Sequence, residues 1–392
     1  MGNDEKSMGC EKRLLRLYIA TFGCQMNVRD SELVAGLFVD KGYKLVFSKD
    51  DADIILFNTC SVREHAEDRV WGNIGMLRRL KRSRPHIIIG VIGCMAQRFG
   101  NDFFKRSDLV DLVCGPCDEE KLPQLAEKVL KGREKMLSIG NIGKPRKEAF
   151  SEYRCRKDSA YVNISHGCNN FCSYCIVPYV RGREVSRKPE NIIREIKMLA
   201  DKGIKEITLL GQNVNSYGIE TRNQSTETRK NGFVDLLKKI NSIDGIERIR
   251  FMTSHPKDAS EDLFKAMAGL SKIVKHLHLP LQSGSDKILK LMNRGYTAEK
   301  YLALVERLRK TVPHCRLTTD IIVGFPGETK ADFEKTYDLM KKIKFDAAYI
   351  FKYSPRPPAA SSKMKDNVPL EEKERRNQLL LQLQRGIKNE KK

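Results

Sequence analysis

Short apolar stretches of strand type alternate with stretches of helical periodicity along most of this chain, and this alternation restricts its fold more than any other feature. In the first part of the sequence, three strand patterns are separated by two helical ones, at 16–23, 31–43, 51–58, 63–82 and 86–93. Strands that alternate with helices form parallel sheets, because each helix carries the chain back to the edge where it started. The pattern predicts an α/β unit with a parallel sheet.

A second alternating series follows a polar and basic segment at 138–158, which we expect to be a linker. It contains six strand patterns, most of them separated by helical ones, at 160–165, 206–211, 248–254, 276–280, 316–325 and 346–354. Six successive βα units predict a partial, TIM-like (β/α)6 barrel. We therefore expect a Rossmann-like α/β domain over 14–137, a barrel domain over 159–370 and a charged helical tail over 371–392.

The charge of the chain favours a polyanionic partner. Lys and Arg together number 72 and Asp and Glu 50, which gives a formal net charge of +22. Nucleic acid is the simplest partner for such a surplus, and a lysine-rich solubilising surface is the alternative. No segment has the ~20 apolar residues of a membrane span, and the N-terminus has no apolar signal core. We expect a cytoplasmic protein.

Three cysteines stand where a predicted strand gives way to a helix. Cys24, Cys60 and Cys94 follow three successive strand patterns of the first domain. Ligands of parallel α/β sheets bind outside the carboxyl ends of the strands, so the three thiols are expected at one edge. Each thiol alone is explained as a small buried hydrophobe. Their equivalent positions favour a shared metal site.

A second set of cysteines lies in "GCNNFCSYC", after the first strand of the barrel. Cys168, Cys172 and Cys175 have the spacing C-x₃-C-x₂-C, whereas zinc sites usually use four ligands in C-x₂-C pairs. A cubic iron–sulfur cluster takes four ligands, one per iron. Three thiolates would leave one iron open to a group that is not protein.

At this point the residues resemble a known family. "CNNFCSYC" is similar to the cluster motif of radical S-adenosylmethionine (SAM) enzymes, and the wider sequence resembles the radical SAM methylthiotransferases of the tRNA 2-methylthioadenosine synthase type. The resemblance covers about residues 14–385 and rests on eight motifs that occur in order: "TFGCQMNVRDSE", "NTCSVREHAEDR", "GCMAQR", "HGCNNFCSYCIVPYVRGREVSR", "LLGQNVNSYG", "TSHP", "HLPLQSGSD" and "TTDIIVGFPGETKADFEKT".

The resemblance implies two [4Fe–4S] clusters and SAM as cofactors. The ligands of the catalytic radical cluster, whose open iron is chelated by SAM, correspond to Cys168, Cys172 and Cys175. The ligands of the auxiliary cluster correspond to Cys24, Cys60 and Cys94. Tyr174 matches an aromatic residue beside the adenine of SAM. One electron from the radical cluster then cleaves SAM to a 5′-deoxyadenosyl radical, which is able to break an unactivated adenine C2–H bond.

The implied activity adds a methylthio group to C2 of N6-isopentenyl(dimethylallyl)adenosine at position 37 of tRNA. Family alternatives are the synthase for threonylcarbamoyl-adenosine and the enzyme that modifies an aspartate of a small-subunit ribosomal protein. A non-catalytic iron–sulfur RNA-binding or electron-transfer protein is the alternative from another class. Such a carrier needs fully ligated clusters, whereas both cysteine sets here contain three.

The resemblance and the motifs also predict several partners and contacts. We expect the tRNA anticodon stem-loop, a reductant such as flavodoxin or ferredoxin, a sulfur donor and a monomeric enzyme. The sequence ends about where the family usually has an RNA-binding TRAM module, and we expect that module to be absent from it; either the chain is truncated there or the barrel surface contacts RNA by itself. Candidate RNA contacts are Arg181, Arg183 and Arg187 in "RGREVSR", and candidate cofactor contacts are Gln212 and Asn213 in "GQNVNSY".

Other motifs carry weaker predictions. "CGPC" at 114–117 has thioredoxin-like spacing, but an incidental pair is favoured. "QSGSD" at 282–286 is either a contact loop or a helix start capped by Ser285, and "GFPGET" at 324–329 allows a tight turn near a ligand. We expect the histidines of the barrel, among them His255 and His276, to be structural.

Overall fold

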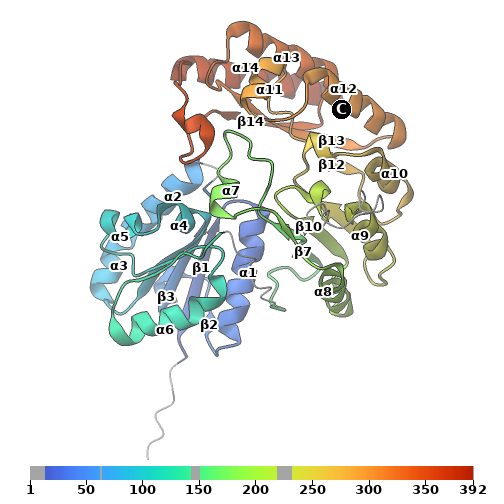
Figure 1. The fold of residues 1–392 in the computed structure, drawn as a ribbon. Helices are drawn as coiled ribbons and strands as arrows, with labels where there is room; N and C mark the ends of the chain where they lie inside the picture. Colours follow the sequence, from blue (N-terminus) through green and yellow to red (C-terminus); the bar gives the residue numbers. More distant parts are fainter. Residues whose placement is uncertain (1–13, 62–63, 143–150, 219–231, 392) are drawn as a thin grey trace, which may run out of the picture.

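The computed structural model describes residues 14–61, 64–142, 151–218 and 232–391. The middle of the predicted linker and most of the polar loop at 218–232 lie outside these residues. The chain forms an N-terminal domain, blue to teal in Figure 1, and a larger domain that runs from green to red. Within the described part, no helix combines the length and apolar character that crossing a bilayer requires.

The N-terminal domain is built on a six-stranded parallel sheet with the order β2-β1-β3-β4-β5-β6. Its three predicted strands are confirmed, and three short ones join them. Every residue of β3 and β4 is buried, as expected for central strands covered on both faces. The strands are β1 (Arg16–Phe22), β2 (Lys44–Leu45), β3 (Ile54–Thr59), β4 (Ile88–Gly93), β5 (Leu112–Cys114) and β6 (Met136–Ser138).

Helices cover both faces of this sheet. One apolar core lies under α2 and α4, and a second lies on the opposite face under α1 and α6. The predicted helix at 63–82 is divided in two next to Leu77, and the helix predicted from residue 31 begins six residues earlier. The helices are α1 (Gln25–Val39), α2 (Glu64–Met76), α3 (Arg78–Ser83), α4 (Cys94–Phe99), α5 (Asp102–Arg106) and α6 (Leu122–Gly132).

The second domain is an open parallel barrel, and its six predicted strands are all confirmed. They form two three-stranded sheets, β11-β10-β7 and β12-β13-β14, which a parallel bridge between Ile249 and Ile273 connects. The strands therefore follow one another in chain order around the barrel. They are β7 (Ser159–Asn163), β10 (Glu206–Leu210), β11 (Arg248–Phe251), β12 (His276–His278), β13 (Arg316–Val323) and β14 (Ala347–Lys352).

The outer layer of the barrel consists of helices, with a small antiparallel pair, β8 (Ser165–His166) and β9 (Val185–Ser186), beside its first strand. The predicted C-terminal tail is helical and packs on β14, and Leu380 on this helix lies in the barrel core. The helices are α7 (Val177–Val180), α8 (Pro189–Asp201), α9 (Gly232–Asn241), α10 (Glu261–Gly269), α11 (Asp286–Leu291), α12 (Ala298–Thr311), α13 (Lys330–Ile343) and α14 (Leu370–Glu390).

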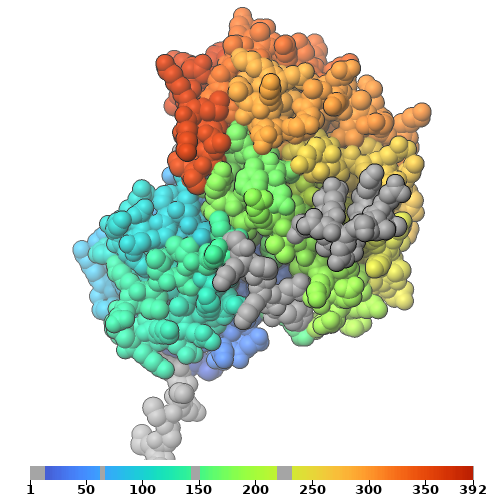
Figure 2. Space-filling view, in the orientation of Figure 1, coloured from blue at the N-terminus to red at the C-terminus, as the bar shows by residue number. Residues whose placement is uncertain are grey.

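Buried ion pairs hold the two domains together. Glu195 on α8 of the barrel pairs with Arg29 on α1 at 3.3 Å, with Arg154 at 2.7 Å and with Arg187 at 2.8 Å. Figures 1 and 2 show α7 and the green segment around it between the N-terminal domain and the rest of the barrel. Of these three pairs, Arg29–Glu195 joins the two domains, and breaking it would leave an uncompensated buried charge at their interface.

Candidate active site

The first set of cysteines gathers at the carboxyl edge of the N-terminal sheet. Strands β1, β3 and β4 are neighbours, and their last residues Phe22, Thr59 and Gly93 lie side by side in the ladder. Cys60 and Cys94 directly follow β3 and β4, and Cys24 is the N-cap residue of α1. We refer to these three cysteines as the sheet triad.

Short side chains and a glycine shape the space around the sheet triad. Cys24 Sγ lies 3.2 Å from Asn27 Oδ1, and Asn27 Nδ2 donates to Asn58 Oδ1 at 3.0 Å. Gly93 has a φ of 85°, and a Cβ there would lie 2.4 Å from Asn58 Oδ1. This corner therefore requires glycine both for its backbone conformation and for the space that the amide pair occupies.

The thiols of the sheet triad affect one another. A hydrogen bond with Cys60 lowers the pKa of the Cys24 thiol to about 6, and the positive charge of Arg181 contributes in the same direction against the opposing effect of burial. Burial raises the pKa of the Cys94 thiol, and the positive charge of Arg181 offsets part of this increase. The three sulfurs thus share one environment, and a cation stands beside them.

That cation comes from the other domain. Arg181 follows α7 of the barrel, donates from Nε to Cys94 Sγ at 3.1 Å and pairs through Nη2 with Asp30 Oδ2 at 2.6 Å. Its side chain is only 4% exposed. We expected Arg181 at an RNA-contacting rim, but in this structure it is an interior residue, because its carboxylate and thiol partners hold the guanidinium between the domains.

The second set of cysteines lies in one loop between β8 and α7. Cys172 is buried, and Cys168 and Cys175 are half-buried. The loop is held by a hydrogen bond from Cys168 N to Gly182 O at 3.1 Å and another from Ser173 N to Met292 O at 3.0 Å. Burial, followed by the neighbouring thiols, raises the pKa of Cys168 to about 11 and that of Cys175 to about 12. We refer to these three cysteines as the loop triad.

A second arginine, which the sequence did not single out, stands beside the loop triad. Arg294 donates from Nη1 to Cys172 Sγ at 3.2 Å and lies 3.3 Å from the hydroxyl of Tyr174. Its Nη2 donates to Pro280 O at 3.0 Å, and its side chain is buried. Nothing in the sequence around this lone arginine marks it, since only the fold brings it to the cysteines. Tyr174 packs beside it against a small apolar cluster.

Buried polar atoms without partners surround the mouth of the barrel. They lie at or after the ends of four successive strands, β7, β10, β11 and β12, where barrel enzymes bind their ligands. Native proteins leave few such atoms unsatisfied, so their concentration here indicates a place for a polar ligand. They are Asn163 Oδ1, Ser165 Oγ, Gln212 Oε1, Asn213 Oδ1, Ser254 Oγ, His255 Nε2 and Gln282 Oε1.

Two of the predicted cofactor contacts, Gln212 and Asn213, are among these residues. Asn213 is 2% exposed, and its Nδ2 donates to Asp258 Oδ2 at 2.7 Å. Gln212 is half-buried and contacts the sulfur of Met26 on α1 through Nε2. Met26 lies two residues after Cys24, so the barrel mouth faces the edge of the sheet that carries the sheet triad.

The other two predicted RNA contacts differ from each other. Arg183 is exposed, and its guanidinium lies 5.3 Å from the ring centroid of Phe171. Arg187 is half-buried, donates to Asn163 O at 2.6 Å and pairs with Glu195. Of the three predicted arginines, only Arg183 therefore presents its side chain to solvent.

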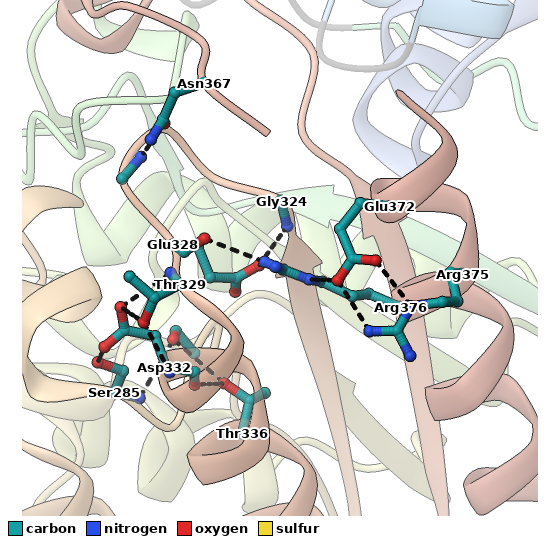
Figure 3. Close-up of polar contacts among 12 residues, drawn as sticks. Ser285, Gly324, Glu328, Thr329, Asp332, Thr336, Asn367, Glu372, Arg375 and Arg376 are labelled. Carbon is teal, nitrogen blue, oxygen red and sulfur yellow. Dashed lines mark hydrogen bonds and ion pairs between the residues drawn. The ribbon is translucent and has the colours of Figure 1, made fainter. Parts of the chain in front are cut away.

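Polar groups of the protein itself contact Ser285, in the segment after β12, and the turn that follows β13 (Figure 3). Thr329 and Asp332 form the capping box of α13, and Ser285 donates to Asp332 Oδ1 at 2.7 Å. Glu328 accepts from Gly324 N and from Arg376 on α14, both at 2.6 Å. The structure thus favours an ordinary turn for 324–329, whereas Ser285 stands at the N-cap position of α11 without a capping hydrogen bond from its side chain.

Neither triad is closed around a single metal ion. Within the described ranges, no three His, Cys, Asp or Glu side chains surround a point that one ion could occupy. A cubic cluster instead distributes its thiolates over separate irons. The sheet triad and the loop triad each supply three thiols without a fourth cysteine beside them in sequence, which suits clusters with one iron open to another ligand.

Two family models match the chain. Residues 162–340 match the radical SAM superfamily, and residues 16–115 match an uncharacterised protein family, UPF0004. The two matches fall on the barrel domain and on the N-terminal domain, respectively. Each therefore covers the sequence that contains one of the triads.

Curated relatives match almost the whole chain. The chain is 51% identical over 368 residues to the tRNA-2-methylthio-N(6)-dimethylallyladenosine synthase of Caldicellulosiruptor saccharolyticus, covering 93% of this chain and 77% of the relative. It is 50% identical over 382 residues to the synthase of the same name from Thermoanaerobacter sp., covering 96% and 79%.

Solved structures share the fold. The radical SAM methyltransferase TsrM from Kitasatospora setae has a TM-score of 0.63 at 14% identity, with 89% of this chain and 74% of that one covered. The cobalamin-dependent radical SAM enzyme OxsB has a TM-score of 0.59 at 14% identity, with 89% and 55% covered. At such low identity the likeness concerns the fold alone, a parallel α/β domain joined to a radical SAM barrel.

Proposed function

Since the chain belongs to the tRNA-2-methylthio-N(6)-dimethylallyladenosine synthases, we infer that it is a radical SAM methylthiotransferase that adds a methylthio group to C2 of N6-dimethylallyladenosine in tRNA. We further propose that the modified nucleoside is at position 37, beside the anticodon. The observation that best supports the chemistry is the presence of two separate cysteine triads on facing parts of the two domains.

The side chains at both triads fit iron–sulfur clusters. Each triad contributes three thiols, and a buried arginine stands beside one sulfur of each, where it would offset part of the negative charge of a cluster. Two [4Fe–4S] clusters and SAM, when bound, would supply the electron, the radical chemistry and a metal site for the transferred sulfur. The loop triad would hold the radical cluster, and the sheet triad would hold the auxiliary cluster.

The protein's own groups have three tasks in this scheme. Arg294 and Arg181 hold one thiolate ligand of each triad in place and balance part of the charge. The unpartnered polar atoms at the barrel mouth, Gln212 and Asn213 among them, orient SAM and the nucleoside. The apolar walls beside Tyr174 keep water from the reaction.

An exposed aromatic pair suits contact with an RNA loop. Phe171 and Tyr179, about one third exposed, have ring centroids 6.5 Å apart, and Arg183 lies over Phe171. Bases of single-stranded loops stack on aromatic and guanidinium groups. We assign the RNA contact near the loop triad to these three residues in place of Arg181.

The reaction also needs partners. A one-electron reductant of the flavodoxin or ferredoxin class and a sulfur donor are part of the proposal, with the enzyme acting as a monomer in the cytoplasm. The tRNA substrate that names the curated relatives supports that location.

The function is tested by anaerobic reconstitution with iron and sulfide, followed by incubation with SAM, dithionite and tRNA that carries dimethylallyladenosine. Nucleoside mass spectrometry is expected to show the 2-methylthio product. The matched control is tRNA with unmodified adenosine at the same position. Absence of the product from a preparation that contains both clusters and cleaves SAM would overturn the substrate assignment.

A further inference from the structure

His255, which the sequence suggested to be structural, has one ring nitrogen satisfied and one without a partner. The histidine follows β11, and its Nδ1 accepts a hydrogen bond from the backbone N–H of Lys257 at 3.3 Å. In a neutral imidazole one nitrogen accepts and the other carries the proton. Nε2 of His255 is therefore an N–H donor.

This donor is enclosed in the protein. His255 is 4% exposed, and Nε2 has no hydrogen-bond partner. Burial, together with the nearby positive charges of Arg294 and Lys257, lowers the pKa of His255 far below its usual value, so the ring is neutral. Its ring packs edge-on against Tyr296, with centroids 5.8 Å apart. A buried donor without a partner destabilises the protein, and a ligand in the barrel mouth that accepted from it would remove this cost.

An acceptor without a partner lies on the adjacent loop. Asn213, after β10, is 2% exposed, and its Oδ1 makes no hydrogen bond. The orientation of the amide is defined, because Nδ2 donates to the carboxylate of Asp258, which only accepts. Asn213 therefore offers an oxygen, not an N–H group.

The two loops are bound to each other, which holds the backbone of His255 in place relative to the loop that carries Asn213. Asn215 Oδ1 accepts from His255 N at 3.0 Å, and Asn215 Nδ2 donates to His255 O at 3.3 Å. Asp258, which orients Asn213, also donates its own N–H to His255 O at 3.0 Å. Both loops belong to the barrel mouth, where the ends of β10 and β11 adjoin in the sheet.

We propose that His255 Nε2–H and Asn213 Oδ1 together bind the edge of an adenine ring. An adenine edge presents an N6–H donor beside a ring-nitrogen acceptor, which is the complement of this donor and acceptor. The inference rests on the proposed function, and it names two residues and a base edge within that site. Two ligands of the reaction contain adenine: SAM and the dimethylallyladenosine of the tRNA.

The test compares binding of these two ligands to anaerobically reconstituted protein without reductant. Dissociation constants are measured for SAM by equilibrium dialysis and for an anticodon stem-loop carrying dimethylallyladenosine by fluorescence anisotropy. His255→Phe keeps a ring beside Tyr296 and removes the donor, whereas His255→Gln retains an N–H group. The matched control is His276→Phe, because Nε2 of His276 already has Thr318 Oγ1 as a partner at 3.0 Å.

His255→Phe is expected to weaken one of the two ligands by roughly tenfold, with partial recovery in His255→Gln and no change in His276→Phe. Asn213→Leu is expected to weaken the same ligand. Weaker SAM binding assigns the pair to the cofactor adenine, and weaker stem-loop binding assigns it to the substrate adenine. Iron content and thermal unfolding establish that each variant is folded.

Unchanged affinities for both ligands in folded His255→Phe would overturn the inference. Equal losses in His255→Phe and His276→Phe would also overturn it, since the effect would then not depend on an unpaired donor. The proposed function is judged separately: if the unaltered protein modifies tRNA and these affinities do not change, only the adenine-binding pair is wrong.

Discussion

The two triads of cysteines are assembled in different ways. The loop triad lies within eight residues of one segment, and its arginine, Arg294, belongs to the same domain. The sheet triad is collected from three strand ends, and its arginine, Arg181, reaches it from the other domain. The loop triad therefore depends on one domain, whereas the surroundings of the sheet triad are complete only when the domains are docked.

The two arginines also differ in their counter-charges. Arg181 pairs with the carboxylate of Asp30, which balances much of its charge. Arg294 instead contacts the carbonyl of Pro280 and the hydroxyls of Tyr174 and Tyr296. More of the positive charge of Arg294 thus acts on the thiol beside it. The comparison predicts that Arg181 matters most for stability and Arg294 most for the properties of its cluster.

The largest expected effect separates the roles of the triads. Cys172→Ala is expected to abolish both SAM cleavage and methylthio transfer, while Cys60→Ala is expected to abolish only methylthio transfer. The reason is that each substitution removes a ligand from one triad. Chromatography of 5′-deoxyadenosine and mass spectrometry of tRNA nucleosides measure the two activities. If Cys60→Ala lost SAM cleavage as completely as Cys172→Ala, the division of roles would be contradicted.

Iron analysis tests the same division without activity. The reconstituted protein is expected to contain about eight irons, and a variant with Cys168, Cys172 and Cys175 all changed to alanine about four, since each triad would hold one cube. A variant with the three cysteines of the sheet triad changed to alanine should likewise contain about four irons. A triple variant that kept eight irons, or retained none, would contradict two independent sites.

Arg181→Met is expected to have the next largest effect, on stability. It leaves the buried carboxylate of Asp30 without its partner at 2.6 Å, and breaking such a pair costs about 3–5 kcal/mol. Chemical denaturation of the protein measures the change. The double variant Arg181→Met/Asp30→Leu should recover much of the loss; a double variant as unstable as Arg181→Met would show that the charge pair is not the cause.

Arg294→Lys is expected to lower the reduction potential of the radical cluster. The substitution removes the planar guanidinium group that donates to Cys172 Sγ. Because hydrogen bonds to sulfur stabilise the more negative reduced cluster, their loss lowers the potential. The potential is measured by a redox titration followed by electron paramagnetic resonance, in a background without the sheet triad. Arg181→Lys, in that same background, should leave this potential unchanged; an equal shift would remove the distinction between the arginines.

The smallest effect is expected for Arg183, the exposed arginine on the segment that carries Arg181. Arg183→Gln should leave stability within about 0.5 kcal/mol, as surface substitutions usually do. If Arg183 contacts phosphate, the log–log salt dependence of stem-loop binding should decrease by roughly one. Lys388→Gln, an exposed change of the same charge on α14, serves as the control. An unchanged salt slope in Arg183→Gln would exclude this phosphate contact.

The sequence by itself determined the succession of elements and both sets of thiols. The strand patterns at 51–58 and 86–93 were predictable from their apolar runs, IILF and IIIGVI, because central parallel strands are buried on both faces. Parallel strands place all their carboxyl ends at one edge, so the sheet triad followed from counting strands. The loop triad needed no fold at all, since its spacing is local.

Only the tertiary structure decided which polar residues contact these thiols. Arg181, Arg183 and Arg187 look alike in sequence, but one is buried at a sulfur, one is exposed and one pairs with Glu195. Arg294 lies more than one hundred residues after the cysteine that it contacts. Partners of this kind depend on how domains and loops pack against each other, because the strength of a buried charge or an unpaired donor is set by its surroundings. Local pattern describes each residue's own segment, and it contains no information about what lies across the interface.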